Sequence, residues 1–295
     1  GNTDKWLDHI INIIKRSRFH VGYMLRQRAN RYKDKTAFNI LIDKKLKTLS
    51  FSAIWLSVIE TGKALSVFQK NEDIPVIGLL THNQLNSVFV DLACLSFGFR
   101  VIPLPLNSTP EHISFILDHA EITHLFVGGK TGTRLFNEVQ HQHHITVISL
   151  NDTDQLKENT TGWDHFLEQG DSVQDFDPDS CLSNVQMESI QTIMYTSGTT
   201  ANPKGIVFNP VNMMSKRFSR ALALPEIGSR DVFLCYLPLF HTFGRYFELM
   251  GSIFWGATYS FAESPAFNSL LNDFKIVHPT IFISIPKRWV QLYEM

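Results

Sequence analysis

From about residue 76, short apolar runs alternate with stretches of helical periodicity, and this alternation constrains the fold more than any other feature of the sequence. Val76 to Leu80 is an apolar run typical of a buried strand. Apolar side chains then recur at helical spacing from Leu85 to Leu95 and stop before Gly98, and Val101 to Leu104 is the next strand-like run. Strands joined by single helices pair in parallel, with helices covering both faces of the sheet. The sequence therefore predicts an α/β fold.

The same alternation recurs along most of the remaining chain. Thr109 and Pro110 supply an N-cap and a proline at the first helical position, which predicts the start of a helix. Further strands are expected at 125–127, 145–150, 231–237, 258–261 and 280–285, and further helices near 135–139, 163–167, 210–224, 247, 266–275 and 286–295. The polar segment 151–179 interrupts this pattern and is expected to lie at the surface.

Composition excludes several classes of protein. With 295 residues, of which 44% are hydrophobic and 19% charged, the chain can bury the core of one large domain or two modest ones. The 27 Lys and Arg residues nearly balance the 28 Asp and Glu residues, so nucleic acid is not an expected partner. Three scattered cysteines do not form a disulfide framework or a cysteine metal site, which favours a cytoplasmic location.

The N-terminal residues predict an amphipathic helix. Apolar side chains recur at helical spacing from Trp6 to Ile14, beside Lys5, Lys15 and Arg16. We expect this helix to pack its apolar stripe on its own protein, because soluble amphipathic helices vastly outnumber membrane-surface ones. Peripheral contact with a membrane is the alternative. No stretch of the sequence has the length and apolar character of a membrane span.

A polar segment, YTSGTTANPKG at residues 195–205, stands between two apolar runs that predict buried strands, Thr192 to Tyr195 and Ile206 to Phe208. Glycines let successive backbone amides point into one concavity, and the Ser and Thr hydroxyls add donors around it. Lys204 adds a compact cation of the kind that binds phosphate. An ordinary Ser/Thr-rich turn explains the hydroxyls but not the lysine between proline and glycine. The segment predicts a loop that binds a polyanion.

Two common nucleotide-binding motifs are excluded. A Walker P-loop requires glycine immediately before the lysine, where this chain has Pro203. Gly129-Lys130-Thr131 imitates the end of that motif, but its first glycine would fall at His124. No G-x-G-x-x-G follows a strand, so there is no dinucleotide-binding fingerprint either.

The run from Tyr195 to Gly205 resembles the phosphate-binding signature of the adenylate-forming (AMP-binding) superfamily. Leu237-Pro238-Leu239-Phe240-His241 is similar to a second motif at the usual distance downstream, and Asp34-Lys35-Thr36-Ala37 with Leu49-Ser50-Phe51 resembles the N-terminal entry segment. Residues 279–289 look most like the long-chain fatty acid–CoA ligase branch. The resemblance covers nearly the whole chain, but only the first half of a family member.

This resemblance implies a fold of two mostly parallel β-sheets flanked by helices, as in the N-terminal domain of acyl-CoA synthetases. It implies an N-terminal segment, residues 1–70, that packs with the second sub-domain. Residues 71–228 would form the first sub-domain, which ends in the phosphate-binding loop and its following helix, and residues 229–295 would begin the second. The nucleotide would bind between the sub-domains.

The activity implied by the resemblance is ATP-dependent activation of a carboxylic acid, expected to be a fatty acid, followed by acyl transfer to coenzyme A. Magnesium, and donors that are already oriented, would neutralise the departing pyrophosphate. The motif positions make Thr196 the magnesium-side hydroxyl and place the phosphates against Ser197, Gly198, Thr199, Thr200 and Lys204. His241 would lie beside the acyl carboxylate, and Arg245 would line the mouth of the acyl tunnel.

Several alternatives stay open at this point. An acyl-AMP ligase that loads a carrier protein shares the first half-reaction, and a non-catalytic scaffold could keep the fold without turnover. Ala201 stands where family members commonly carry glycine, which would add strain at a positive φ and weaken flexing of the loop.

Four parts of the family's active site would lie beyond Met295: the adenine-contacting segment, the magnesium glutamate, the ribose-binding aspartate and the C-terminal lysine. Residues 1–295 alone are therefore expected to be inactive. An open edge of the second sheet makes a homodimer a hypothesis. His141, His143 and His144 are expected to be solvated rather than metal ligands. Trp55, Phe68 and Trp289 are expected in the core.

Overall fold

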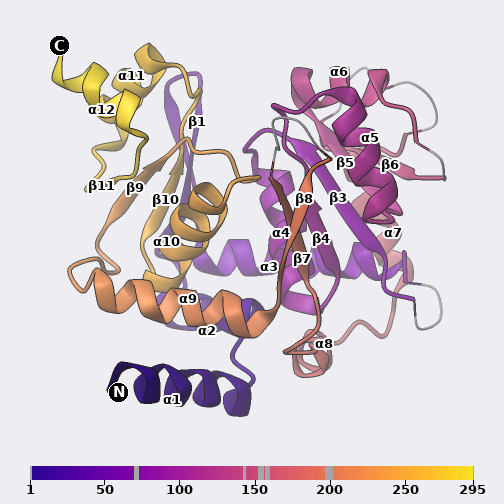
Figure 1. Cartoon of the computed structure of the whole chain (residues 1–295), viewed down its shortest axis with the longest axis horizontal. Coiled ribbons are helices and arrows are strands. Elements are labelled where there is room, and N and C mark those ends of the chain that lie inside the picture. Colours follow the sequence, from indigo (N-terminus) through magenta and orange to yellow (C-terminus); the bar gives the residue numbers. More distant parts are fainter. Residues whose placement is uncertain are drawn as a thin grey trace. The chain divides into compact units, whose positions relative to one another are not determined.

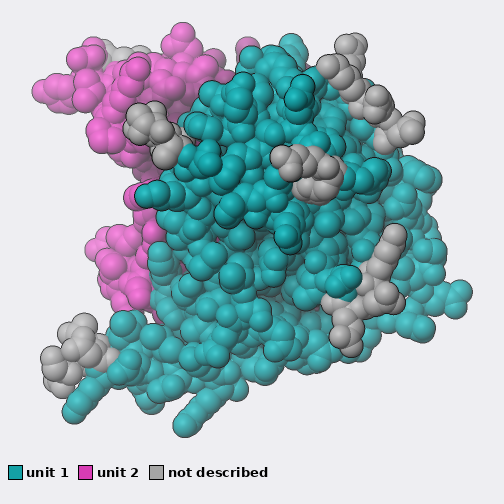
Figure 2. Space-filling model, turned by 45° about the vertical axis from the view of Figure 1, so that its right-hand side comes forward, with its two compact units in different colours: residues 1–23, 56–216 teal, residues 24–55, 217–295 magenta. Residues whose placement is uncertain are grey.

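The computed structural model describes residues 2–69, 73–141, 144–151, 156, 160–196 and 202–294, with residues 2–4 described by their backbone alone. The chain forms two compact units, residues 1–23 with 56–216 and residues 24–55 with 217–295 (Figure 2). The N-terminal segment predicted over residues 1–70 is therefore divided between the two units. The reason is that residues 36–50 form a strand pair that joins the sheet of the second unit.

The first unit contains a six-stranded sheet in the order β6-β5-β3-β4-β7-β8 (Figure 1). Its strands are β3 (Val76–Thr81), β4 (Arg100–Pro103), β5 (His124–Gly128), β6 (Thr146–Ser149), β7 (Thr192–Thr196) and β8 (Lys204–Phe208). All neighbours pair in parallel except β7 and β8, which pair antiparallel. The predicted parallel sheet is confirmed.

Helices cover both faces of this sheet. They include α4 (Leu85–Phe97), α5 (Pro110–His119), α6 (Gly129–Glu138) and α7 (Trp163–Gln169). In β5, Leu125 and Val127 face a core that also holds Ile116 of α5. The intervening Phe126 points to the other face, where its ring centroid lies 5.0 Å from that of Phe166 in α7. Alternate side chains of one strand thus pack against helices on opposite faces of the sheet.

The predicted helix ends of the first unit are confirmed. The Thr109 hydroxyl accepts a hydrogen bond from the His112 amide at 3.4 Å, and Pro110 is the first residue of α5. Gly98 ends α4 with φ of +88°. Such a left-handed conformation costs glycine little because it has no Cβ.

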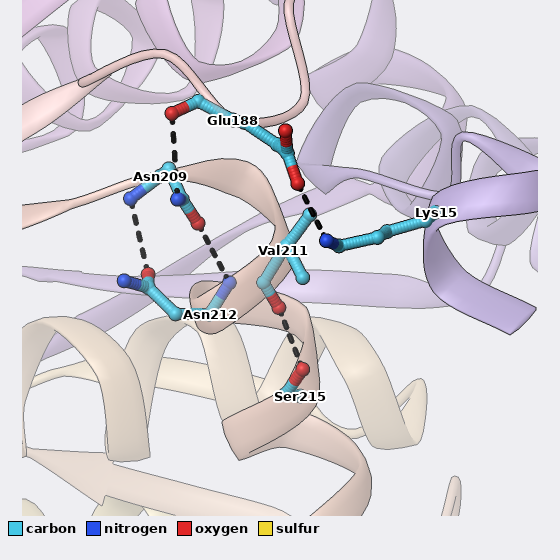
Figure 3. Close-up of polar contacts among 6 residues, drawn as sticks. All are labelled: Lys15, Glu188, Asn209, Val211, Asn212 and Ser215. Carbon is cyan, nitrogen blue, oxygen red and sulfur yellow. Dashed lines mark hydrogen bonds and ion pairs between the residues drawn. The ribbon is translucent and has the colours of Figure 1, made fainter. Parts of the chain in front are cut away.

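The N-terminal helix α1 (Asn2–Ser17) is amphipathic, as its sequence predicts, but Ile14 is its one buried side chain among those described. Ile14 is 1% exposed, whereas Trp6 and Leu7 are each 40% exposed. Lys15 lies 2.5 Å from the Glu188 carboxylate, which ties the end of α1 to the segment before β7 (Figure 3). Among the described residues, no helix combines the length and apolar character that crossing a bilayer requires.

Several helices were not predicted. They are α2 (Val21–Tyr32), α3 (Phe51–Ser66), the short 3-10 helix η1 (Gly170–Ser172) and α8 (Pro178–Asn184). α2 and α3, together with α9 (Pro210–Ala223), contain the points at which the chain passes from one unit to the other. α9 itself matches the helix predicted over residues 210–224.

The second unit contains a five-stranded sheet in the order β11-β9-β10-β1-β2. Its strands are β1 (Thr36–Ile42), β2 (Lys45–Ser50), β9 (Val232–Cys235), β10 (Thr258–Phe261) and β11 (Ile281–Phe282), and only β1 and β2 pair antiparallel. Its helices include the π-helix η2 (Phe243–Leu249), α10 (Met250–Trp255), α11 (Phe267–Val277) and α12 (Pro286–Tyr293). Phe38, Phe233 and Tyr259 are fully buried in its core.

Two predictions for this unit need correction. The strand expected over residues 280–285 is only the two-residue β11, whereas the helix expected near Phe247 is confirmed by η2 and α10. Trp289, expected in the core, is 49% exposed, because α12 has no buried residue. Apolar periodicity alone does not show whether anything covers a helix.

Candidate functional site

The two described ends of the polar segment predicted to bind phosphate belong to the antiparallel strands β7 and β8 of the first unit. The register places Tyr195 opposite Gly205 and Thr196 opposite Lys204. The Thr196 hydroxyl donates a long hydrogen bond, 3.4 Å, to the Lys204 carbonyl oxygen. Ser197, Gly198, Thr199, Thr200 and Ala201 lie outside the described residues. The structure thus brings the two ends of the segment together.

Strand β7 ends at the carboxyl edge of the six-stranded sheet. β7 is parallel to β4, and β4 is parallel to β3, so Thr196 ends its strand at the same edge as Pro103 and Thr81. The connections from β3 to β4 and from β4 to β5 run in opposite directions across the sheet. In open α/β sheets, ligands bind beyond the carboxyl ends of the strands, where the strand order reverses. Thr196 therefore ends its strand at the edge where a ligand is expected.

The described ends of the segment offer a hydroxyl and an ammonium group to solvent. Both Thr196 and Lys204 are exposed, while Pro203 is buried. Within the described residues, no three His, Cys, Asp or Glu side chains form a group that could hold a metal ion. Magnesium commonly keeps several waters and binds through one or two protein oxygens and substrate phosphates. Thr196 is compatible with that kind of binding, but the described residues alone do not form a metal centre.

Gly205 is required by the packing of the hairpin. A Cβ at this position would lie 2.8 Å from Cγ2 of Ile193 and 3.3 Å from ring carbons of Tyr195. The Tyr195 ring, only 4% exposed, occupies the space that a larger residue would need. The glycine next to the lysine thus has a steric reason that is independent of any ligand.

The second strand of the hairpin corrects one prediction. Ile206 and Val207 were expected to be buried, but they are 48% and 51% exposed. β8 lies at the end of the strand order, and among the described strands only β7 pairs with it. Only Phe208, at the end of β8, is buried as predicted.

Hydrogen bonds fix the exit of the hairpin into α9 (Figure 3). The Asn209 amide donates to Oδ1 of Asn212 at 3.0 Å, and the Asn212 amide donates to Oδ1 of Asn209 at 2.9 Å. The Asn209 side chain also donates to the Glu188 carbonyl at 3.5 Å, and Ser215 donates to the Val211 carbonyl at 2.8 Å. This reciprocal pair satisfies amides that would otherwise lack partners at the helix start.

His241, the predicted catalytic residue, belongs to the second unit, whereas Thr196 and Lys204 belong to the first. It follows β9 and precedes η2, and its backbone amide donates to the Pro238 carbonyl at 3.0 Å. His241 is exposed, and its ring centroid lies 4.7 Å from that of Phe240. Partial burial lowers the pKa of His241, which favours the neutral imidazole. Its predicted role stays a prediction.

The π-helix η2 buries two ionisable residues. Arg245 is 0% exposed, and its guanidinium donates to the Tyr246 hydroxyl at 3.5 Å. Glu248 is also 0% exposed, and neither of its carboxylate oxygens has a hydrogen-bond partner among the described residues. Burial raises the pKa of this carboxyl well above its ordinary range, and the nearby Leu237 backbone offsets only part of the effect. The burial of Glu248 is not predictable from the local sequence, because a lone acid in a helical stretch is normally solvated.

Comparisons with known proteins agree with these features. The chain matches the family described as AMP-binding enzyme over residues 25–295. It is 30% identical over 228 residues to the peroxisomal long chain acyl-CoA synthetase 7 of Arabidopsis thaliana. The aligned region covers 74% of this chain and 31% of that relative. The chain spans about a third of the length of such curated relatives, for example 35% of long chain acyl-CoA synthetase 6 from the same organism.

Two solved structures show the same fold. The N-terminal domain of FACL13 from Mycobacterium tuberculosis has a TM-score of 0.76 at 18% identity, covering 94% of this chain and 65% of that chain. The o-succinylbenzoate coenzyme A synthetase MenE from Bacillus subtilis, solved in complex with ATP and magnesium ion, has a TM-score of 0.68 at 20% identity. That match covers 92% of this chain and 51% of that chain.

Proposed function

Because this chain belongs to the AMP-binding enzyme family, we propose that it is the phosphate-binding part of an ATP-dependent acyl-CoA synthetase. In this proposal, a carboxylate oxygen of the acid attacks the α-phosphorus of ATP. The bond from that phosphorus to the bridging oxygen breaks, and pyrophosphate leaves. The thiol of coenzyme A then attacks the acyl carbon of the acyl-adenylate, giving a thioester, AMP and a proton.

The observation that carries the proposal is the pairing of Thr196 with Lys204 at the carboxyl edge of a parallel sheet. The Lys204 ammonium would neutralise charge that grows on the pyrophosphate, without having to reorganise. Ser197, Gly198, Thr199 and Thr200 would supply further donors, and Thr196 would face the magnesium ion. The ion, when bound, would supply additional positive charge at the phosphates.

For the substrate, we propose a fatty acid. Support comes from the relatives, which are long chain acyl-CoA synthetases. MenE, solved in complex with ATP and magnesium ion, supports ATP and magnesium as the other ligands. His241 would act at the acyl carboxylate. Its lowered pKa supports a neutral imidazole that can donate one hydrogen bond to an acyl oxygen.

Substitution at the two paired residues tests this proposal in the protein at its full natural length. We expect Lys204→Ala to weaken MgATP binding about 10- to 100-fold, the range for one charge-assisted hydrogen bond. Thr196→Ala should weaken it less, and both variants should slow pyrophosphate release that depends on a fatty acid. Calorimetry and a pyrophosphate assay measure the two effects. Lys47→Ala, at an exposed lysine on β2, is the matched control.

The outcomes separate the alternatives. MgATP binding that is unchanged in Lys204→Ala and Thr196→Ala contradicts the assignment of the hairpin. Nucleotide binding without acid-dependent pyrophosphate release supports a non-catalytic scaffold. Acyl transfer to a carrier protein, with no requirement for coenzyme A, supports an acyl-AMP ligase. Peripheral membrane contact through α1 and self-association remain predictions.

A further inference from the structure

A hydrogen bond links the hairpin to the helix α5. Nδ1 of His119 lies 2.8 Å from the Tyr195 hydroxyl, and the two rings meet edge to face, with centroids 5.9 Å apart and an interplanar angle of 87°. The two residues are 76 positions apart in the sequence. Tyr195 immediately precedes Thr196, so the bond anchors the strand one residue before the segment predicted to bind phosphate.

His119 is held on a rigid support. It is the last residue of α5, and its ring stacks on Phe115, one turn earlier, with centroids 5.0 Å apart and an interplanar angle of 29°. The buried side of the same helix places Ile113 and Ile116 in the core of the first unit, which also contains Tyr195. The imidazole therefore has a fixed position from which to hold the phenol.

Tyr195 in turn connects both ends of the predicted phosphate loop. Its ring packs against the position of Gly205 across the hairpin, next to Lys204, and its own backbone leads directly to Thr196. Side chains alternate along a strand, so Tyr195 points into the core while Thr196 points to the opposite face of the sheet. Because Tyr195 adjoins Thr196 along β7 and pairs with Gly205, the neighbour of Lys204, a shift of the phenol would move Thr196 and Lys204 together.

We infer that His119 is a positioning residue for the nucleotide-phosphate site, acting through the Tyr195 hydroxyl. The inference rests on the proposed function, because it assumes that the hairpin binds the phosphates of ATP. His119 does not contact the nucleotide in this account. It restricts the hairpin to the conformation that binds, so that less conformational freedom is lost on binding.

The test compares His119→Ala, Tyr195→Phe and His119→Asn in the protein at its full natural length. The first two variants remove the bond, whereas asparagine can place Oδ1 near the former position of Nδ1. We expect the first two to raise the Kd for MgATP about three- to tenfold, as for one net hydrogen bond. KM for ATP should rise in parallel, with kcat changed less, and His119→Asn should recover most of the affinity. The double variant His119→Ala/Tyr195→Phe should be no weaker than either single variant.

Two controls separate positioning from general damage. His112→Ala changes another histidine of α5 and should leave the Kd unchanged. The Tm of each nucleotide-free variant reports whether the fold itself is weakened. Unchanged Kd values for His119→Ala and Tyr195→Phe overturn the inference, and so does a loss of affinity that asparagine does not recover. Failure of the unsubstituted protein to bind MgATP overturns the proposed function instead.

Discussion

A single methyl group at position 205 is expected to disturb the β7–β8 hairpin. The added Cβ of Gly205→Ala would lie 2.8 Å from Ile193 Cγ2 and 3.3 Å from the Tyr195 ring, and Tyr195 is also held by His119. Overpacking of this kind typically costs about 1–3 kcal/mol. We therefore expect the free energy of unfolding to fall by that amount, together with weaker MgATP binding. Denaturant unfolding and calorimetry measure these two effects.

Gly228 provides the matched control for this substitution. A Cβ at Gly228 would meet no atom within 4 Å, so Gly228→Ala restricts the backbone conformations of that residue without overpacking its surroundings. Equal stability of the two alanine variants would show that the close approach at Gly205 is not what requires glycine there.

The residues of the candidate site differ in how far the sequence predicted them. Thr196 and Lys204 were found because hydroxyls, glycines and a lysine cluster within one short segment. His119 was not found, since its partner is 76 positions away and only the packing of α5 brings the two together. Glu248 was missed for a related reason: nothing in its local sequence shows that it is buried.

Strands and helices were predictable where burial and periodicity agree. β3 and α4 lie inside a sheet with helices on both faces, so their apolar pattern is unambiguous. β8 was expected to be buried and is exposed, because its place at the sheet edge depends on pairing that the local sequence does not encode. The pairing of β1 with β10 joins segments about 220 residues apart, and local periodicity carries no information about it.

Because Glu248 is buried in the π-helix η2, we expect an unusual pH dependence of the free energy of unfolding. In the unfolded chain this carboxyl loses its proton near its ordinary pKa of 4.5, whereas in the folded state burial raises the pKa well above that value. The folded state therefore binds more protons above pH 4.5, and the free energy of unfolding falls as pH rises until the folded-state pKa is reached. The slope contributed by this one group is at most about 1.4 kcal/mol per pH unit.

Glu248→Gln should remove this contribution. We expect the variant to show a flatter decline of stability above pH 4.5, so that it gains relative to the unsubstituted protein as pH rises. Urea unfolding at a series of pH values measures the difference. Glu226→Gln, at an exposed glutamate before β9, should leave the profile unchanged. Parallel profiles for Glu248→Gln and the unsubstituted protein would show that this carboxyl does not titrate differently on folding.

The two units each supply one part of the predicted chemistry. The first unit contains Thr196 and Lys204, and the second contains His241. Each unit has its own mostly parallel sheet and its own buried core, so the residues of each part stand on a folded unit. Within the described residues, however, no cluster of acidic, histidine or cysteine side chains completes a magnesium site.

The last prediction concerns the 295 residues taken alone. Because the chain spans only 31% of its Arabidopsis thaliana relative, we expect it to form no acyl-adenylate, while the protein at full natural length does. Both proteins are assayed for pyrophosphate release with ATP, magnesium and a panel of fatty acids, and Lys204→Ala in the full-length protein marks the level of a damaged phosphate site. The contrary result would be pyrophosphate release by the 295 residues that depends on a fatty acid and is lost in the Lys204→Ala variant of the same 295 residues. That result would show that all groups needed for adenylate formation are present within them.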